Sequence, residues 1–493
     1  MSKNPVIGQI LDSYKPIWAL NHAASLFEWD LETYMPLDAA KPRGFAQAQL
    51  ALIRQQKVLG LTESVSKAEK LDGLSDYEKG TLRNIKRELK YYTRIPPELV
   101  EELTRTTTEA SVVWREARKR SDFSLFEPYL EKIVQLKRRE ADKLGYEGHP
   151  YNALMDLFEE NLTTHDVDKV FSPLVTALKR ILSRIVASKS FPSSHKLEDV
   201  AYDEEDMRRV NQEVLRILGM PDKTFRMDVS THPFTAGMSL DDVRITTRYE
   251  GNSFRETIFS VIHECGHALY DLQVDHSLQY TPLAGGPSLG MHESQSRFWE
   301  NFVGRSREFT NLLYPILKKN LPFVSDYSEE DIYRYFNLVR PSLIRVAADE
   351  VTYNFHIVVR YEVEKKLIGG EAKVSEIPEI WDDMMEEYVG VRPKTLAEGV
   401  LQDVHWSGGM IGYFPTYSLG TVIAGMVSNR MQRDLNVPDL VARGDLSPIK
   451  VWLRENIHKW GSIYSPKELQ KKILGDVYNP EYLVKYLEKK YLA

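Results

Sequence analysis

The chain has 493 residues, of which 42% are hydrophobic and 27% are charged, and its formal net charge at pH 7 is −7. It is longer than a small binding module. Its composition is that of an ordinary folded globular protein, which excludes collagen-like, mucin-like and disordered chains. Because the net charge is negative, we expect neither nucleic acid nor an anionic membrane surface as the main partner.

The cysteine content and the hydrophobic segments indicate the cellular location. Cys265 is the only cysteine, so the chain cannot form an intramolecular disulfide. The N-terminal residues lack the apolar core and cleavage site of a secretory signal, and no uninterrupted apolar run reaches about 18 residues. We therefore expect a cytoplasmic protein without a transmembrane span.

Helical periodicity covers most of the chain. From residue 4 to about residue 182, segments with helical spacing alternate with short breaks at proline or glycine. In residues 112–136, the apolar side chains are spaced mostly by three and four, as in amphipathic helices. The same pattern returns from Glu293 to the C-terminus, without a fixed-period repeat that would indicate a solenoid. The sequence therefore predicts a mainly α fold.

Residues 225–249 depart from this helical pattern. They are rich in Thr, Val and Ile, they alternate apolar with polar residues, and they contain turn signals at Ala236-Gly237 and Asp241-Asp242. We expect a small antiparallel sheet of about three strands here. This sheet would lie directly before the strongest chemical motif in the chain.

The next segment predicts a helix that carries a metal-binding motif. Ser253 and Glu256 have the spacing of a capping box, and apolar residues follow at helical intervals. Within this helix, residues 263–267 read His-Glu-Cys-Gly-His. His263 and His267 lie four residues apart, so their imidazoles project from the same face and can bind one zinc ion.

The residues inside the motif have different expected roles. Glu264 is turned by about 100° from His263, which lets it hold a metal-bound water without being a ligand. Cys265 is turned by about 200°, so we expect it to be a small core residue. A carboxylate buried between two histidines would be costly without an ion, and this favours a metal site over a purely structural pair of histidines.

A catalytic zinc ion needs a third protein ligand and an open fourth position. Residues 270–273 read Tyr-Asp-Leu-Gln, which excludes the motif that supplies a third histidine from the same helix. A glycine-rich loop at residues 284–290, interpreted as a hinge, leads to a second amphipathic helix. Glu293 lies 26 residues after His267 (293 − 267), which is far enough for a returning helix. We predict Glu293 as the third ligand, with Glu300 and His292 as alternatives.

At this point the chain resembles the carboxypeptidase Taq family of zinc metallocarboxypeptidases. Seven short motifs carry the resemblance, occur in the order of the family and span nearly the whole chain. They are HPF at 232–234, DVRIT at 242–246, HECGH at 263–267, HESQS at 292–296, IRVAAD at 344–349, GVLQDVHW at 399–406 and GYFPTY at 412–417.

The resemblance implies a two-lobed helical fold around a deep central groove, with residues 1–493 forming one catalytic domain. It also implies a homodimer and one zinc ion per chain, for which cobalt is a possible substitute. The implied activity is the stepwise release of amino acids from peptides with a free C-terminus, with broad specificity. In this comparison Glu293 takes the place of the third zinc ligand.

Residue roles follow from the matched motifs. Zinc would activate a water, and Glu264 would take the water proton and pass it to the leaving amine. His405 and Tyr417 are expected to donate hydrogen bonds to the oxyanion, with Tyr413 as the alternative to Tyr417.

Substrate-binding residues are expected in the same motifs. The terminal carboxylate calls for an arginine, and Arg244 and Arg345 are the two candidates. His232 and Gln402 are predicted to line the same pocket. The edge of the strand at residues 243–247 is expected to pair with the peptide backbone.

Two other functions fit parts of the pattern. A zinc endo-oligopeptidase would share the histidine pair and the distant glutamate, since these residues do not report where a peptide is cut. A non-catalytic helical scaffold with structural zinc is the second alternative. Structural zinc sites are usually closed by four ligands and rich in cysteine, so a single cysteine that points away from the metal fits this alternative badly.

Overall fold

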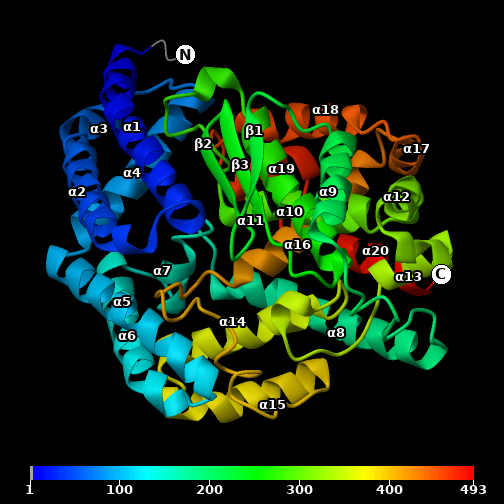
Figure 1. Ribbon diagram of the computed structural model, residues 1–493. Helices are drawn as coiled ribbons and strands as arrows, with labels where there is room; N and C mark the ends of the chain where they lie inside the picture. The colour runs from blue at the N-terminus through cyan, green and yellow to red at the C-terminus, as the bar shows by residue number, and fades with distance from the viewer. Residues whose placement is uncertain (1–3, 493) are drawn as a thin grey trace. The chain divides into compact units, whose positions relative to one another are not determined.

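The computed structural model describes residues 4–492 and is mainly helical, with one small sheet (Figure 1). This confirms the predicted fold class. The chain divides into two compact units. The first comprises Met1–Tyr92, His195–Phe336 and Met426–Val477, and the second comprises Thr93–Ser194, Asn337–Gly425 and Tyr478–Ala493.

The first unit contains the sheet and the helix with the histidine pair. Its elements are α1 (Pro5–Thr33), η1 (Leu37–Ala39), α2 (Ala40–Leu59), α3 (Thr62–Ala68), α4 (Asp76–Arg94, ending just inside the second unit), α9 (Glu204–Leu218), β1 (Phe225–Val229), β2 (Thr235–Ser239), β3 (Asp242–Thr247), α10 (Phe254–Gln273), η2 (His276–Leu278), α11 (Leu289–Arg297), the π-helix η3 (Phe298–Gly304), α12 (Arg307–Asn320), η4 (Pro322–Asp326), α13 (Glu329–Phe336), α17 (Val437–Ala442), α18 (Ser447–Asn456), η7 (His458–Trp460) and α19 (Pro466–Leu474).

The regular elements of the second unit are all helices among its described residues. Its elements are α5 (Pro97–Arg120), α6 (Phe123–Leu144), α7 (Tyr151–Met155), α8 (Thr164–Ser188), η5 (Arg345–Ala347), α14 (Tyr353–Gly369), η6 (Val374–Glu376), α15 (Ile377–Val389), the first part of α16 (Pro415–Met431) and α20 (Glu481–Leu492).

Local signals in the sequence set many of the helix ends. The Thr163 side chain caps the first turn of α8 in a capping box with Asp166, which satisfies backbone donors that have no partner inside the helix. Gly370 ends α14 and Gly390 ends α15, both in the left-handed conformation that glycine adopts without strain. Within residues 4–492, every helix is too short or too polar to cross a membrane.

Helix α10 lies among β3, α9, α11 and η3 (Figure 1). It begins where the sequence predicts, but the expected capping box is wrong. Ser253 has a left-handed backbone, with φ 55° and ψ 55°, and its side chain makes no cap hydrogen bond. Gly266 explains how α11 approaches so closely, because a Cβ atom there would lie 2.6 Å from Ser296 Cα and 2.7 Å from Gln295 O.

The sheet has the order β1-β3-β2 and is mixed. β2 is antiparallel to β3, as predicted, whereas β1 is parallel to β3, so the antiparallel prediction is wrong for this pair. The reason is the connection at residues 230–234, which crosses the end of β3. The Ser230 hydroxyl lies 2.7 Å from Thr246 Oγ1, and Phe234 donates its backbone N–H to the same atom at 3.0 Å.

Two further expectations about the sheet are wrong. β3 is the central strand, so both of its edges are paired within the sheet and neither is open to a peptide. The turn predicted at Ala236-Gly237 lies inside β2 instead. A Cβ atom at Gly237 would come within 2.7 Å of Asp271 Oδ2 on α10, so a larger residue there would have to displace that side chain.

Candidate metal centre

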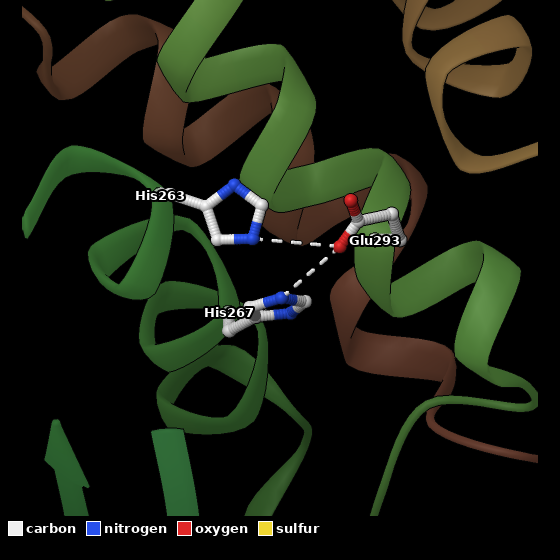
Figure 2. Close-up of side chains that lie close together, drawn as sticks. All are labelled: His263, His267 and Glu293. Carbon is white, nitrogen blue, oxygen red and sulfur yellow. Dashed lines mark ion pairs between the residues drawn. The ribbon is translucent and has the colours of Figure 1, made fainter. Parts of the chain in front are cut away.

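The two motif histidines and Glu293 come together in the first unit. Figure 2 shows the imidazoles of His263 and His267, one turn apart on α10, facing the Glu293 carboxylate on α11. Glu293 Oε2 lies 3.5 Å from His263 Nε2 and 3.4 Å from His267 Nε2. The three ligand atoms lie within 4.8 Å of one another, so one ion could contact them all.

The electrostatics of this cluster suit a divalent cation. Burial would raise the pKa of Glu293, but Arg297 and His263 hold it well below its usual range, so the carboxylate is ionised. Burial lowers the pKa of His267 and leaves its imidazole neutral, as a ligand must be. Burial alone would also lower the pKa of His263, yet Glu293 and Glu300 raise it to about 10. The buried carboxylates around His263 thus favour a positive charge at this position. Two imidazoles and one carboxylate are a zinc donor set.

The two alternative ligands, Glu300 and His292, lie behind the histidines. Glu300 Oε2 is 2.9 Å from His263 Nδ1, the ring nitrogen that faces away from Glu293. His292 Nδ1 is 3.2 Å from His267 Nδ1, and His292 Nε2 is 3.0 Å from Asp271 Oδ1. Partners of this kind fix the orientation and tautomer of metal-bound histidines.

Glu264 lies beside the cluster and is 7% exposed. Thr235 Oγ1 lies 2.6 Å from Glu264 Oε2 and 3.0 Å from the Glu264 carbonyl oxygen. β2 therefore holds this carboxylate in place from outside the helix. Cys265 is fully buried, as expected for a core residue.

A second cluster of predicted residues forms in the second unit. His405 Nε2 lies 3.3 Å from Tyr417 OH. The ring centroid of Tyr413 is 5.6 Å from that of His405 and 5.1 Å from that of Tyr417. Burial, reinforced by Arg345 and Arg360 against the opposing effect of Asp403, lowers the pKa of His405 to about 4, so this imidazole is neutral at pH 7.

Arg345 belongs to the same cluster and is 7% exposed. It donates to Asp403 Oδ1 from Nε at 3.0 Å and from Nη2 at 2.9 Å, and to Tyr353 OH from Nη1 at 3.2 Å. Arg360 binds the other oxygen, Oδ2, of the same aspartate, with 2.7 Å from its Nε. Gln402 accepts the Arg345 backbone N–H at 3.0 Å and donates to the Glu398 carbonyl at 2.9 Å. Its amide is thus committed to backbone groups.

The remaining predicted residues, Arg244 and His232, lie in the first unit. Arg244 on β3 forms a two-point ion pair with Asp242, with both contacts at 2.7 Å, and its guanidinium stacks on Trp29. His232 is exposed in the connection before β2, and its carbonyl accepts the Ser230 hydroxyl at 2.6 Å.

Sequence reasoning missed three residues that hold the predicted ones in place. Asp403 lies inside the GVLQDVHW motif and pairs with two buried arginines, Arg345 and Arg360. Its role depends on how these arginines pack around it, and the sequence does not show that packing. Thr235 and Arg297 follow the HPF and HESQS motifs directly. Nothing in the sequence pattern distinguishes them from ordinary neighbours.

Comparison with known proteins covers the whole chain. A family model described as carboxypeptidase Taq (M32) metallopeptidase matches residues 9–491. Thermostable carboxypeptidase 1 of Pyrococcus furiosus is 49% identical over 496 residues, 99% of each chain. Carboxypeptidase 1 of Bacillus subtilis is 37% identical over 98% of this chain and 97% of its own. A solved Pyrococcus furiosus carboxypeptidase structure gives a TM-score of 0.98 at 48% identity and covers 100% of both chains. The chain therefore belongs to the carboxypeptidase Taq (M32) family of metallopeptidases.

Proposed function

We propose that the protein is a zinc carboxypeptidase that releases amino acids one at a time from the C-termini of peptides, with broad specificity. The observation that carries this proposal is the cluster of His263, His267 and Glu293 with Glu264 beside it on α10. The matched family supports the peptidase activity. Residues 1–493 would act as one catalytic domain, as a homodimer in the cytoplasm.

In this proposal, Nε2 of His263, Nε2 of His267 and Oε2 of Glu293 hold one Zn²⁺, and Co²⁺ could occupy the same donor set. A bound Zn²⁺ supplies Lewis acidity toward the attacking water and the scissile carbonyl. Glu264 takes the proton from the water and passes it to the leaving amine. The Thr235 hydroxyl keeps the Glu264 carboxylate in one orientation for both transfers.

His405 and Tyr417 would donate hydrogen bonds to the oxyanion that forms at the carbonyl. Their mutual contact of 3.3 Å supports a paired role, and it favours Tyr417 over Tyr413, whose ring packs against both. Because the His405 imidazole is neutral at pH 7, it can donate a hydrogen bond without carrying a charge that water would have to solvate.

Arg345 is the better candidate for binding the terminal carboxylate. It shares Asp403 with Arg360, so two guanidinium groups face one carboxylate and the buried cluster keeps a net positive charge. Arg244 is paired one-to-one with Asp242, which leaves no net charge to attract an anion. Gln402 then orients the Arg345 backbone, and His232 has only a peripheral role in substrate binding.

Mass spectrometry of a peptide digested over time tests the proposal. With a free C-terminus, we expect a ladder of products that differ by single C-terminal residues. The same peptide with a C-terminal amide should resist cleavage, because the amide removes the charge that Arg345 would bind. Internal fragments, or unchanged cleavage of the amide, would instead identify an endo-oligopeptidase.

Glu264→Gln separates catalysis from metal binding in the same assay. We expect this variant to hold zinc at wild-type stoichiometry and to lose turnover by several orders of magnitude, since it removes the proton acceptor while keeping the side-chain shape. Zinc content is measured by elemental analysis. An active Glu264→Gln enzyme would contradict the role of Glu264, and a fully inactive wild-type protein with bound zinc would indicate the structural scaffold.

A further inference from the structure

Arg297 connects two buried carboxylates at the candidate metal centre. It lies at the end of α11, one turn after Glu293, and its side chain is 13% exposed. Its Nε donates to Glu293 Oε1 at 2.7 Å, and its Nη1 donates to Glu300 Oε2 at 3.2 Å. One guanidinium therefore binds the carboxylate that faces both Nε2 atoms and the carboxylate behind His263.

This contact makes the two oxygens of Glu293 unequal. Oε1 is committed to Arg297, whereas Oε2 lies 3.5 Å and 3.4 Å from the two histidine Nε2 atoms. In the last turn of α11, the Ser296 hydroxyl lies 2.7 Å from the Glu293 carbonyl oxygen and 3.0 Å from Glu293 Oε2, so it helps to orient this second oxygen. A free carboxylate can bind a metal through one oxygen or both, and here only one oxygen is turned toward the histidines.

Resting on the proposed role of Glu293 as a ligand, we propose that Arg297 is a positioning residue that keeps Glu293 a one-oxygen ligand through Oε2. The consequence is an open coordination position, because a catalytic zinc ion with three single-atom protein ligands keeps its fourth place for water. By binding Glu300 as well, Arg297 ties the orientation of His263 to that of Glu293.

A lysine could not make the same arrangement. Its ammonium is a single point of charge, whereas the planar guanidinium presents several N–H groups at fixed angles to two acceptors. The second guanidinium nearby, Arg305, donates to Glu300 Oε1 at 2.9 Å. It therefore neutralises Glu300 without binding Glu293, and this makes Arg305 a matched control.

Visible absorption of the Co²⁺-loaded protein tests the proposal, since four-coordinate Co²⁺ absorbs much more strongly than Co²⁺ with five or six ligands. We expect Arg297→Met to lower this absorption severalfold, because Oε1 is released and can join the metal. Arg305→Met should keep the wild-type spectrum, although it also removes a positively charged partner of Glu300. Arg297→Lys should give an intermediate spectrum. A wild-type spectrum in Arg297→Met would overturn the proposal.

A separate variant, Glu293→Gln, tests whether Glu293 is a metal ligand at all, independently of the positioning role of Arg297. Zinc affinity of Glu293→Gln is measured by competition with a chelator, and we expect it to fall by at least about tenfold. If Glu293→Gln binds zinc as tightly as the wild type, Glu293 is not a ligand and the proposed function loses its site. If only Arg297→Met behaves as wild type, the positioning role alone is wrong. Circular dichroism confirms that each variant is folded.

Discussion

At the scale of single residues, the candidate site depends on side chains that touch neither metal nor substrate. Glu293 and Glu300 are seven residues apart and both face α10. Their sequence positions do not determine which of them meets the Nε2 atoms and which meets His263 Nδ1. The contacts of Arg297 and Arg305 make that difference, and such contacts depend on packing between elements.

Thr235 allows a sharp test at this scale, because its hydroxyl lies 2.6 Å from Glu264 Oε2. We expect Thr235→Val to lower kcat by about ten- to a hundredfold, since a hydrogen bond to a charged group that orients the proton acceptor is worth roughly 1.5–3 kcal/mol. KM should stay near its wild-type value, because Thr235 contacts Glu264 and not the proposed substrate-binding arginines. Steady-state kinetics on one short peptide measures both constants.

Thr235→Ser is the matched control for this prediction. It keeps the hydroxyl and should restore most of the wild-type kcat. If the valine variant matches wild type in kcat, or if valine and serine are equally slow, the hydroxyl does not orient Glu264.

At the scale of elements, the sequence predicted helices and motif placement better than it predicted how the strands pair. The spacing of His263 and His267 places both on one face of α10, because the helical period alone decides this. The parallel pairing of β1 with β3 depends on hydrogen bonds to Thr246 from the connecting segment. The αL backbone of Ser253 likewise replaces the expected cap. Neither outcome follows from local propensity.

Glu364 on α14 shows how one buried group fixes a neighbouring segment. It is fully buried and accepts hydrogen bonds from Tyr151 OH at 2.5 Å, Trp406 Nε1 at 2.7 Å and the Gly412 N–H at 2.8 Å. Burial, against the opposing effect of these donors, raises the pKa of Glu364 to about 7. The residues between Trp406 and Gly412 join the two motifs that carry His405 and Tyr417, so Glu364 anchors that stretch of chain.

The raised pKa of Glu364 predicts a pH dependence of stability. The folded protein keeps this proton up to about pH 7, whereas the unfolded chain releases it near 4.5. The contribution of Glu364 to the free energy of unfolding therefore falls as pH rises, by about 2–3 kcal/mol between pH 5 and pH 8. In Glu364→Gln this contribution should be absent. Urea unfolding of both proteins at the two pH values gives the difference.

Glu362→Gln, on the same helix but partly exposed and paired with Lys365, is the control. It should follow the wild-type change between pH 5 and pH 8. A parallel pH dependence in wild type and Glu364→Gln would show that Glu364 does not carry this proton.

At the scale of the whole molecule, all three candidate ligands come from the first unit, on α10 and α11. Metal binding should therefore stabilise this unit directly. At a free zinc concentration about 1,000 times the dissociation constant, the stabilisation is about 4 kcal/mol. We expect a chelator to lower the unfolding temperature by several degrees and added Zn²⁺ to restore it. Hydrogen exchange should become faster in α10, α11 and η3, with much smaller changes in α14 and α15 of the second unit.

Glu264→Gln is the control for the thermal measurement, because it should keep the metal while losing turnover. Its unfolding temperature should fall on chelation by the same amount as that of the wild type. If chelation changes neither protein, the cluster of His263, His267 and Glu293 does not hold a stabilising ion. If exchange accelerates equally in both units, the effect of the metal is not confined to the unit that supplies its ligands, and the two units unfold together.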